Sequence, residues 1–173
     1  IGLVGSEMCI RDRYMPTDNG RELSKRSITR SEMGLPEKAF VFCCFNNNYK
    51  ITGAEFDIWM RLLNKVDGSV LWLRKSNQVS YLNLIKEAEK REVDPSRIVF
   101  AESAEMNDHL ARHKLADLFI DTFAFNAHTT ATESLWAGLP IVTKSGRGFA
   151  ARVAGSILTA VGLSELITET EEE

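Results

Sequence analysis

Five short apolar runs alternate with helix-like segments along most of this chain, and this alternation constrains the fold more than any other feature. The expected strands are spaced roughly 25 residues apart, as in repeated strand–helix units, and cover residues 40–45, 69–73, 97–100, 117–121 and 141–143. The expected helices cover residues 54–66, 79–92, 106–114, 130–138 and 149–161, with short ones near 29–33 and 163–167. Such an order predicts an α/β fold, a Rossmann-like parallel sheet with right-handed crossovers and helices on both faces.

Apolar side chains at helical spacing predict which faces are buried. The segment 54–66 presents Phe56, Trp59, Met60 and Leu63 on one side. In the segment 79–92 we expect Leu82, Ile85 and Ala88 to face inward, and we expect Trp59, Trp72 and Trp136 in the core. The first strand is apolar on both faces, as buried parallel strands are.

Charge and cysteine content narrow the class of protein. A net charge of −3 gives no reason to expect nucleic acid or an anionic membrane as partner. No apolar run approaches the ~20 residues of a membrane span. Cys9, Cys43 and Cys44 lack metal-binding spacing, so we expect free thiols in a reducing, cytoplasmic compartment.

The chain divides into four parts. Residues 1–13 show no clear period and resemble translated adapter sequence, so we leave them out of the fold. Residues 14–36 are expected to form a linker and a short helix, and residues 37–168 the folded lobe. Residues 169–173 are an acidic end. We interpret the chain as a fragment of a longer protein.

Polar turns follow three of the expected strands, at 46–50, 104–112 and 126–133. Ligands of open parallel sheets bind at the carboxyl ends of strands, so these turns are the candidate site. They supply an ammonium group, hydroxyl groups, imidazoles and a helix start, which together suit a diphosphate. No carboxylate cluster accompanies the histidines, so we expect no metal. Neither a GxGxxG nor a Walker motif is present.

Two of these turns carry a family resemblance. Segments 45–51 (Phe-Asn-Asn-Asn-Tyr-Lys-Ile) and 126–140 (Asn-Ala-His-Thr-Thr-Ala-Thr-Glu-Ser-Leu-Trp-Ala-Gly-Leu-Pro) are similar to two signatures of glycosyltransferase family 41. That family includes the protein O-GlcNAc transferases and their bacterial homologues with tetratricopeptide repeats. Segments 69–73, 115–122 and 151–156 match in order. The resemblance implies the C-terminal, donor-binding lobe of a GT-B glycosyltransferase, without the repeats and the N-terminal lobe that contact the protein acceptor.

The resemblance also implies roles for single residues. Lys50 would be catalytic, because it neutralises the leaving UDP. The expected donor-binding residues are Asn47, Ala104, His109, Arg112, His128, Thr129, Thr130 and Glu133. Of these, His128, Thr129 and Thr130 would donate to the diphosphate, while His109 would lie against uracil. Ala104 would contact the base through its backbone, and Arg112 would support that region.

The implied reaction is an inverting transfer of N-acetylglucosamine from UDP-GlcNAc to Ser or Thr, with no metal or other cofactor. We expect this chain alone to be inactive, because half of the cleft would be missing.

Two departures from the family pattern leave alternatives open. Met106 stands where the animal enzymes place a Lys, and Glu133 where an Asp usually meets the ribose. Asn46, Asn47 and Glu133 also resemble plant relatives that use GDP-fucose, although these lack a histidine like His128. UDP is therefore favoured over GDP; a fucosyltransferase lobe, or a nucleotide-sugar-binding module without turnover, stays open.

Some of these residues could also have purely structural roles. Glu133 equally suits a capping box with Thr130, and His113 is expected to be a polar face residue. Asn126 and Gly146 would accommodate tight turns.

Overall fold

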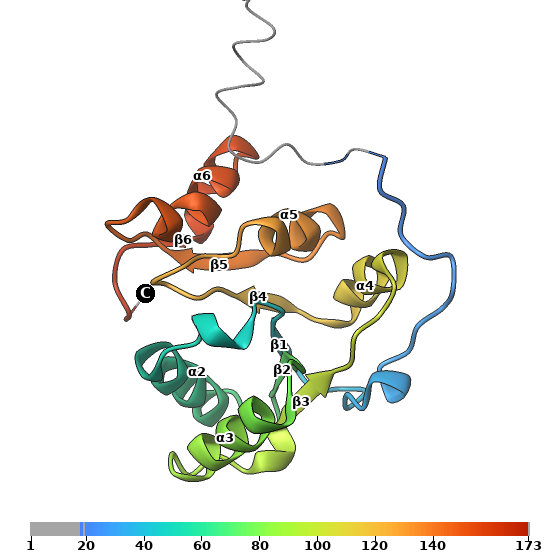
Figure 1. Cartoon of the computed structure of the whole chain (residues 1–173), viewed down its shortest axis with the longest axis vertical. Coiled ribbons are helices and arrows are strands. Elements are labelled where there is room, and N and C mark those ends of the chain that lie inside the picture. Colours follow the sequence, from blue (N-terminus) through green and yellow to red (C-terminus); the bar gives the residue numbers. More distant parts are fainter. Residues whose placement is uncertain (1–17, 19, 173) are drawn as a thin grey trace, which may run out of the picture.

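One parallel sheet organises the molecule (Figure 1). The structure, a computed structural model, describes residues 18 and 20–172, so the expectations for residues 1–13, including Cys9, lie outside the described residues. The strands are β1 (Val41–Cys44), β2 (Val70–Arg74), β3 (Ile98–Ala101), β4 (Leu118–Ile120), β5 (Ile141–Lys144) and β6 (Ile167–Thr168). Their order is β3-β2-β1-β4-β5-β6, with every pair parallel. The Rossmann-like α/β prediction is confirmed.

Helices fill the connections between the strands at the predicted places. The α-helices are α2 (Gly53–Lys65), α3 (Gln78–Glu89), α4 (Met106–Arg112), α5 (Thr129–Trp136) and α6 (Val153–Ala160). Single 3-10 turns are η1 (Ser31–Met33), η2 (Asn48–Lys50), η3 (Pro95–Arg97), η4 (His113–Leu115), η5 (Phe149–Ala151) and η6 (Ser164–Leu166). Strand β6 was not predicted: it has two residues, too few for a pattern, and pairs with β5 through Thr143↔Ile167.

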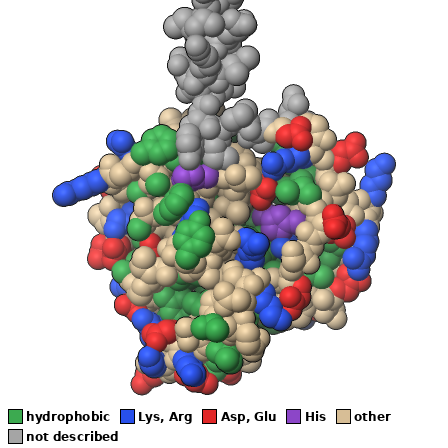
Figure 2. All heavy atoms as spheres, in the orientation of Figure 1, with side chains coloured by type: hydrophobic (Ala, Val, Ile, Leu, Met, Phe, Trp, Pro, Cys, Tyr) green, Lys and Arg blue, Asp and Glu red, His purple; other side chains and the backbone are tan. Residues whose placement is uncertain are grey.

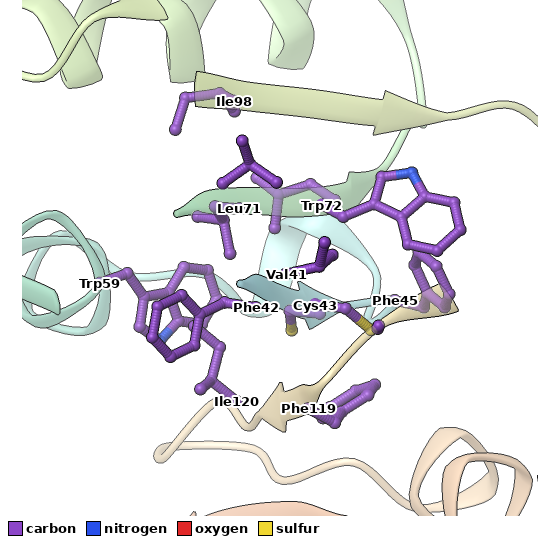
Figure 3. Close-up of a cluster of buried hydrophobic side chains, with 14 of the residues drawn as sticks. Val41, Phe42, Cys43, Phe45, Trp59, Leu71, Trp72, Ile98, Phe119 and Ile120 are labelled. Atoms are coloured by element: carbon purple, nitrogen blue, oxygen red, sulfur yellow. The ribbon is translucent and has the colours of Figure 1, made fainter. Parts of the chain in front are cut away.

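The central strands are buried on both faces, as their unbroken apolar sequence predicts. On one side Trp59 of α2 lies near Phe42 and Ile120, and on the other Trp72 packs edge-on against Phe45, with ring centroids 5.0 Å apart (Figure 3). Burial raises the pKa of both Cys43 and Cys44. The two thiols are free and buried, as expected for inert core cysteines.

Two predicted core residues lie at the surface instead. Leu82 is 45% exposed, because Tyr81, packed 4.7 Å from the ring of Phe100, covers the outer strand in its place. Trp136 is 42% exposed, and its indole Nε1 donates to the carbonyl oxygen of Arg21 at 3.2 Å. Both errors concern helix flanks, where burial depends on which distant segment covers the helix.

The strands that follow β1 in the sequence lie on both sides of it: β2 and β3 on one side, and β4, β5 and β6 on the other. The topological switch point is therefore between β1 and β4. At such a switch point the connections leave toward opposite faces, and the turns after the two strands border a crevice. The Glu55 side chain bridges the two turns. One oxygen completes a capping box with Thr52 at the start of α2, and the other accepts from the backbone N–H groups of Phe123 (2.8 Å) and Ala124 (3.2 Å).

Candidate functional site at the β1–β4 switch point

A buried amide joins the three segments that meet at the switch point. The Nδ2 of Asn46, just after β1, donates to Oδ1 of Asp121 (3.0 Å) and to Oγ1 of Thr122 (2.8 Å), just after β4. Its Oδ1 accepts from the hydroxyl of Thr130 in the first turn of α5, at 2.6 Å. The predicted diphosphate-contacting Thr130 is thereby held against the β1 turn.

Asp121 is the centre of this network. Its Oδ1 also accepts from the N–H groups of Thr122 (2.8 Å) and Ala127 (2.6 Å), and its Oδ2 accepts from the hydroxyl of Thr143 on β5 (2.7 Å). Burial raises the pKa of this carboxyl to about 6, although the hydrogen bonds oppose that shift. Asp121 and Asn46 support the site, although neither was predicted to contact the donor.

Lys50 ends the turn after β1 and reaches across to the β4 turn. Its Nζ donates to the carbonyl oxygen of Asn126 at 2.9 Å and lies 4.0 Å from the centre of the Phe125 ring. Burial lowers the pKa of the ammonium, and the nearby Asp121 charge opposes this. Asn126 itself is buried, and its Nδ2 donates to Thr122 O at 2.9 Å, which is the tight-turn role expected for it.

The start of α5 lies on the same side of Phe125. His128 is its N-cap residue and makes no side-chain capping bond. Its ring packs 4.9 Å from the Phe125 ring, and its Nε2 donates to the carbonyl oxygen of Ala150 at 3.2 Å. Burial lowers the pKa of His128, and the Lys50 charge adds to the effect. Because the first N–H groups of a helix have no intrahelical partner, this start suits an anion.

A second cluster lies one turn further along α5. His109 Nδ1 accepts from Arg112 Nη2 at 2.5 Å, and His109 Nε2 lies 3.6 Å from Glu133 Oε2. Arg112 is buried, donates to the carbonyl oxygen of Glu102 at 2.6 Å, and places its guanidinium 4.8 Å from the Phe45 ring centre. With Glu133 turned to this cluster, the capping box proposed for Thr130 and Glu133 is wrong.

His113 differs from its prediction as a polar face residue. It has no exposed surface, and its Nδ1 donates to the carbonyl oxygen of His109 at 2.7 Å. Its Nε2 has no hydrogen-bond partner among the described residues. Burial, with a smaller effect of the neighbouring His109, lowers the pKa of His113 to about 4. Helix α4 thus continues into η4, where the His113 ring is buried in the core.

The predicted site residues thus form two neighbouring groups connected by α5. Lys50, His128, Thr129 and Thr130 surround the helix start, and His109, Arg112 and Glu133 lie at the β3 side. Ala104 and Arg112 line a cavity of about 170 Å³ that is also bordered by Arg26 and Met33. The Asn47 carbonyl oxygen accepts from the Lys50 N–H at 2.9 Å, but its side chain turns toward β2, where Oδ1 accepts from Arg74 Nη1 at 2.5 Å. Figure 2 shows this face, with histidine surface at two places and basic side chains near both.

Residues 18 and 20–172 contain no group of three or more His, Cys, Asp or Glu side chains arranged to hold a metal ion. None of the helices in the same part of the chain combines the length and apolar character that a membrane span requires.

Comparisons with known proteins show which family the chain belongs to. The family model described as glycosyl transferase family 41 matches residues 9–173. A UDP-N-acetylglucosamine–peptide N-acetylglucosaminyltransferase of Caenorhabditis elegans is 41% identical over 145 residues, and a probable one of Arabidopsis thaliana is 39% identical over 145 residues. These matches cover 84% and 83% of this chain, but the chain spans only 13% and 15% of the two relatives. An O-GlcNAc transferase mutant of Thermobaculum terrenum superposes with a TM-score of 0.75 at 31% identity, over 78% of this chain and 26% of that one.

Proposed function

The chain belongs to glycosyltransferase family 41, and from that premise we propose that it is the donor-binding lobe of a protein O-GlcNAc transferase. The proposed enzyme moves N-acetylglucosamine from UDP-GlcNAc to Ser or Thr side chains of proteins. The names of the relatives from Caenorhabditis elegans and Arabidopsis thaliana support the donor and the peptide acceptor. The acceptor is expected to bind mainly through regions outside this chain.

One observation carries the proposal: a half-buried ammonium lies beside the start of helix α5. Lys50 Nζ and the His128 ring pack on the same Phe125 side chain, and His128 is the N-cap residue of α5. A diphosphate placed here would meet a full positive charge and the partial positive charge of the helix end. The hydroxyl groups of Thr129 and Thr130 lie in the first turn of the same helix.

This arrangement suits the chemistry of inverting sugar transfer. The acceptor hydroxyl oxygen forms a bond to the anomeric carbon, while the bond from that carbon to the β-phosphate oxygen of UDP breaks. The hydroxyl proton leaves to a base that we do not place in this chain. Negative charge grows on the departing UDP, so Lys50 stabilises the transition state more than the bound donor. We propose that these groups meet the diphosphate charge without a metal or other cofactor.

The second group of residues suits the nucleoside. The cavity beside Ala104 and Arg112 lies at the carboxyl end of β3, where backbone groups of the following turn are available to a base. His109 stands between this cavity and α5, held by Arg112. We propose that the uracil occupies this end and the diphosphate the Lys50 end, so that the donor lies along α5.

Binding of UDP by this chain, measured by titration calorimetry, tests the proposal. UDP is expected to bind more tightly than GDP. Lys50→Ala is expected to weaken UDP binding by about 1.5–3 kcal/mol, or roughly 10- to 150-fold in Kd, the usual range for a charge-assisted contact. Lys86→Ala, which removes an exposed lysine of α3, is the matched control and should leave the Kd unchanged. Equal binding of UDP and GDP, or unchanged affinity in Lys50→Ala, would contradict the proposal.

A further inference from the structure

The Glu133 carboxylate is engaged on both oxygens by protein groups. Its Oε1 accepts from Arg21 Nη1 at 3.1 Å, and its Oε2 faces His109 Nε2 at 3.6 Å. We propose that Glu133 is a positioning residue which orients His109 for the nucleobase, that Arg21 holds Glu133 in place, and that Glu133 does not bind the ribose. This inference rests on the proposed function, because it concerns the nucleoside end of that site.

Burial leaves little of the carboxylate for a ligand to reach. The Glu133 side chain is 6% exposed, whereas that of His109 is 16% exposed and that of Arg21 is 20% exposed. A ribose hydroxyl could approach Glu133 only by displacing one of its two partners. Displacing Arg21 would leave a buried carboxylate without its cation, which is costly. The imidazole is therefore the more accessible group for a nucleoside.

The backbone around Arg21 is anchored on the same helices. Its carbonyl oxygen accepts from Nε1 of Trp136 on α5 at 3.2 Å. Three residues on, Ser24 N donates to the carbonyl oxygen of Asn107 on α4 at 3.0 Å, and Arg26 lies 3.8 Å from Asp108. In Figure 1 this blue segment runs beside α4 before the chain enters β1. The Arg21 guanidinium is thus positioned by a segment that contacts both α4 and α5.

His109 has a neighbouring side chain at each ring nitrogen. Arg112 Nη2 can only donate, so His109 Nδ1 accepts and the neutral ring carries its proton on Nε2, directed toward Glu133. The ring also packs 4.8 Å from His113 and 5.3 Å from Phe45. Removing Glu133 would release the Nε2 end of the ring and let its plane rotate. A base stacked on that ring would then lose a fixed surface.

The length of the side chain matters for this role. Glu carries its carboxylate one methylene beyond Asp, about 1.5 Å further from the helix. At the observed contacts of 3.1 Å and 3.6 Å, an Asp at this position would lose its reach to Arg21 and His109. The departure from the family pattern at residue 133 therefore has a structural consequence: the longer acid reaches the protein's own groups.

Comparison of UDP with 2′,3′-dideoxy-UDP, by titration calorimetry on the whole chain, separates positioning from ribose contact. If Glu133 acts through His109, Glu133→Ala weakens both ligands by the same factor, about tenfold for one lost contact. In a His109→Ala background, Glu133→Ala then costs nothing further. Arg21→Ala weakens both ligands as well, by less, and adds nothing to Glu133→Ala. Glu89→Ala, an exposed acid on α3, is the control and leaves both affinities unchanged.

Three outcomes would overturn the inference while UDP still binds the wild-type chain. The first is that Glu133→Ala abolishes the difference between UDP and its dideoxy analogue. The second is that it changes neither affinity, and the third is that it keeps its full effect without His109. Should Glu133→Ala fail to unfold cooperatively, Glu133→Met, which keeps the side-chain length but has no oxygen to accept from Arg21 or His109, takes its place in each comparison. A wild-type chain that does not bind UDP would instead overturn the proposed function, and this inference with it.

Discussion

Acid should destabilise this protein through His113, a residue outside the proposed donor contacts. The pKa of His113 is lowered to about 4 in the folded chain, against 6.5 for an ordinary histidine, because its ring is buried. A folded-state pKa below the unfolded one stabilises the fold above pH 6.5, and that stability is lost as the pH falls toward 4. The full difference corresponds to about 3 kcal/mol, of which about 2 kcal/mol is already lost at pH 5.

The structure explains why the ring resists protonation. The His113 Nδ1 donates to the carbonyl oxygen of His109 at 2.7 Å. A second proton on Nε2 would have no hydrogen-bond acceptor among the described residues. The charged or titratable neighbours that act on it are His109, Glu133 and Arg112. Protonation would place a second positive charge near the buried Arg112 guanidinium without an added hydrogen bond.

Urea unfolding at pH 8 and pH 5, followed by circular dichroism, measures the effect against His113→Asn. The Asn amide stands in for the Nδ1–H donor to His109 O but does not titrate. Its smaller side chain costs stability at both pH values, so the comparison rests on the change with pH. Wild type should lose about 2 kcal/mol more between pH 8 and pH 5 than the variant.

A second buried group titrates in the same range with the opposite sign. Because the pKa of Asp121 is raised to about 6, its contribution to stability falls as the pH rises from about 4 through 6. Asp121 is present in both proteins, and its effect cancels in the difference between them. An equal loss of stability in wild type and His113→Asn on going to pH 5 would refute the reasoning.

Three further outcomes are expected. UDP-GlcNAc should bind more tightly as the pH falls through the range just below 6.5, because an anion favours protonation of His128, whose pKa is lowered in the free chain; His128→Asn should remove this dependence in calorimetric titrations. Arg97→Ala should cost about 2 kcal/mol in urea unfolding, since its guanidinium donates to three carbonyl oxygens at the end of α2 and in the turn after it. Gly146→Ala should cost about 1–3 kcal/mol in the same assay, because the new methyl group would lie 2.6 Å from the Cβ of Ala151; an unchanged midpoint would contradict that packing.

The parts of the fold that could be predicted are those with local signals. Strands buried on both faces appear as unbroken apolar runs, and β1 and β2 were found in this way. The two-residue strand β6 carries no such signal. Trp136 was misplaced because its exposure depends on the segment around Arg21, which is 115 residues distant in sequence. Apolar character alone does not determine which segment covers a helix flank.

The site residues also divide into those that a local sequence signal predicts and those that depend on distant segments. The turns after β1 and β4 were predicted to meet because sheet topology places them at one edge, and Lys50 does contact the β4 turn. The bonds from Asn46 to Asp121 and Thr130 join residues 75 and 84 positions apart, so no local pattern could reveal them. The capping-box reading of Glu133 failed for the same reason: its partners come from distant segments.

Helix α5 connects the two clusters that we propose to bind one extended donor. Thr130 and Glu133 are three residues apart and lie on one helix face, separated by about 4.5 Å along the axis. The Thr130 hydroxyl donates to Asn46 beside the proposed diphosphate end, and Glu133 faces His109 at the proposed nucleoside end. Because a helix stretches little along its axis, the distance between Thr130 and Glu133 is fixed before a donor binds. The proposed spacing from phosphate contacts to base contacts is therefore fixed as well. We therefore expect donor affinity to depend on the residues that support each cluster. Asp121 holds Asn46 in one cluster, and Arg21 holds Glu133 in the other.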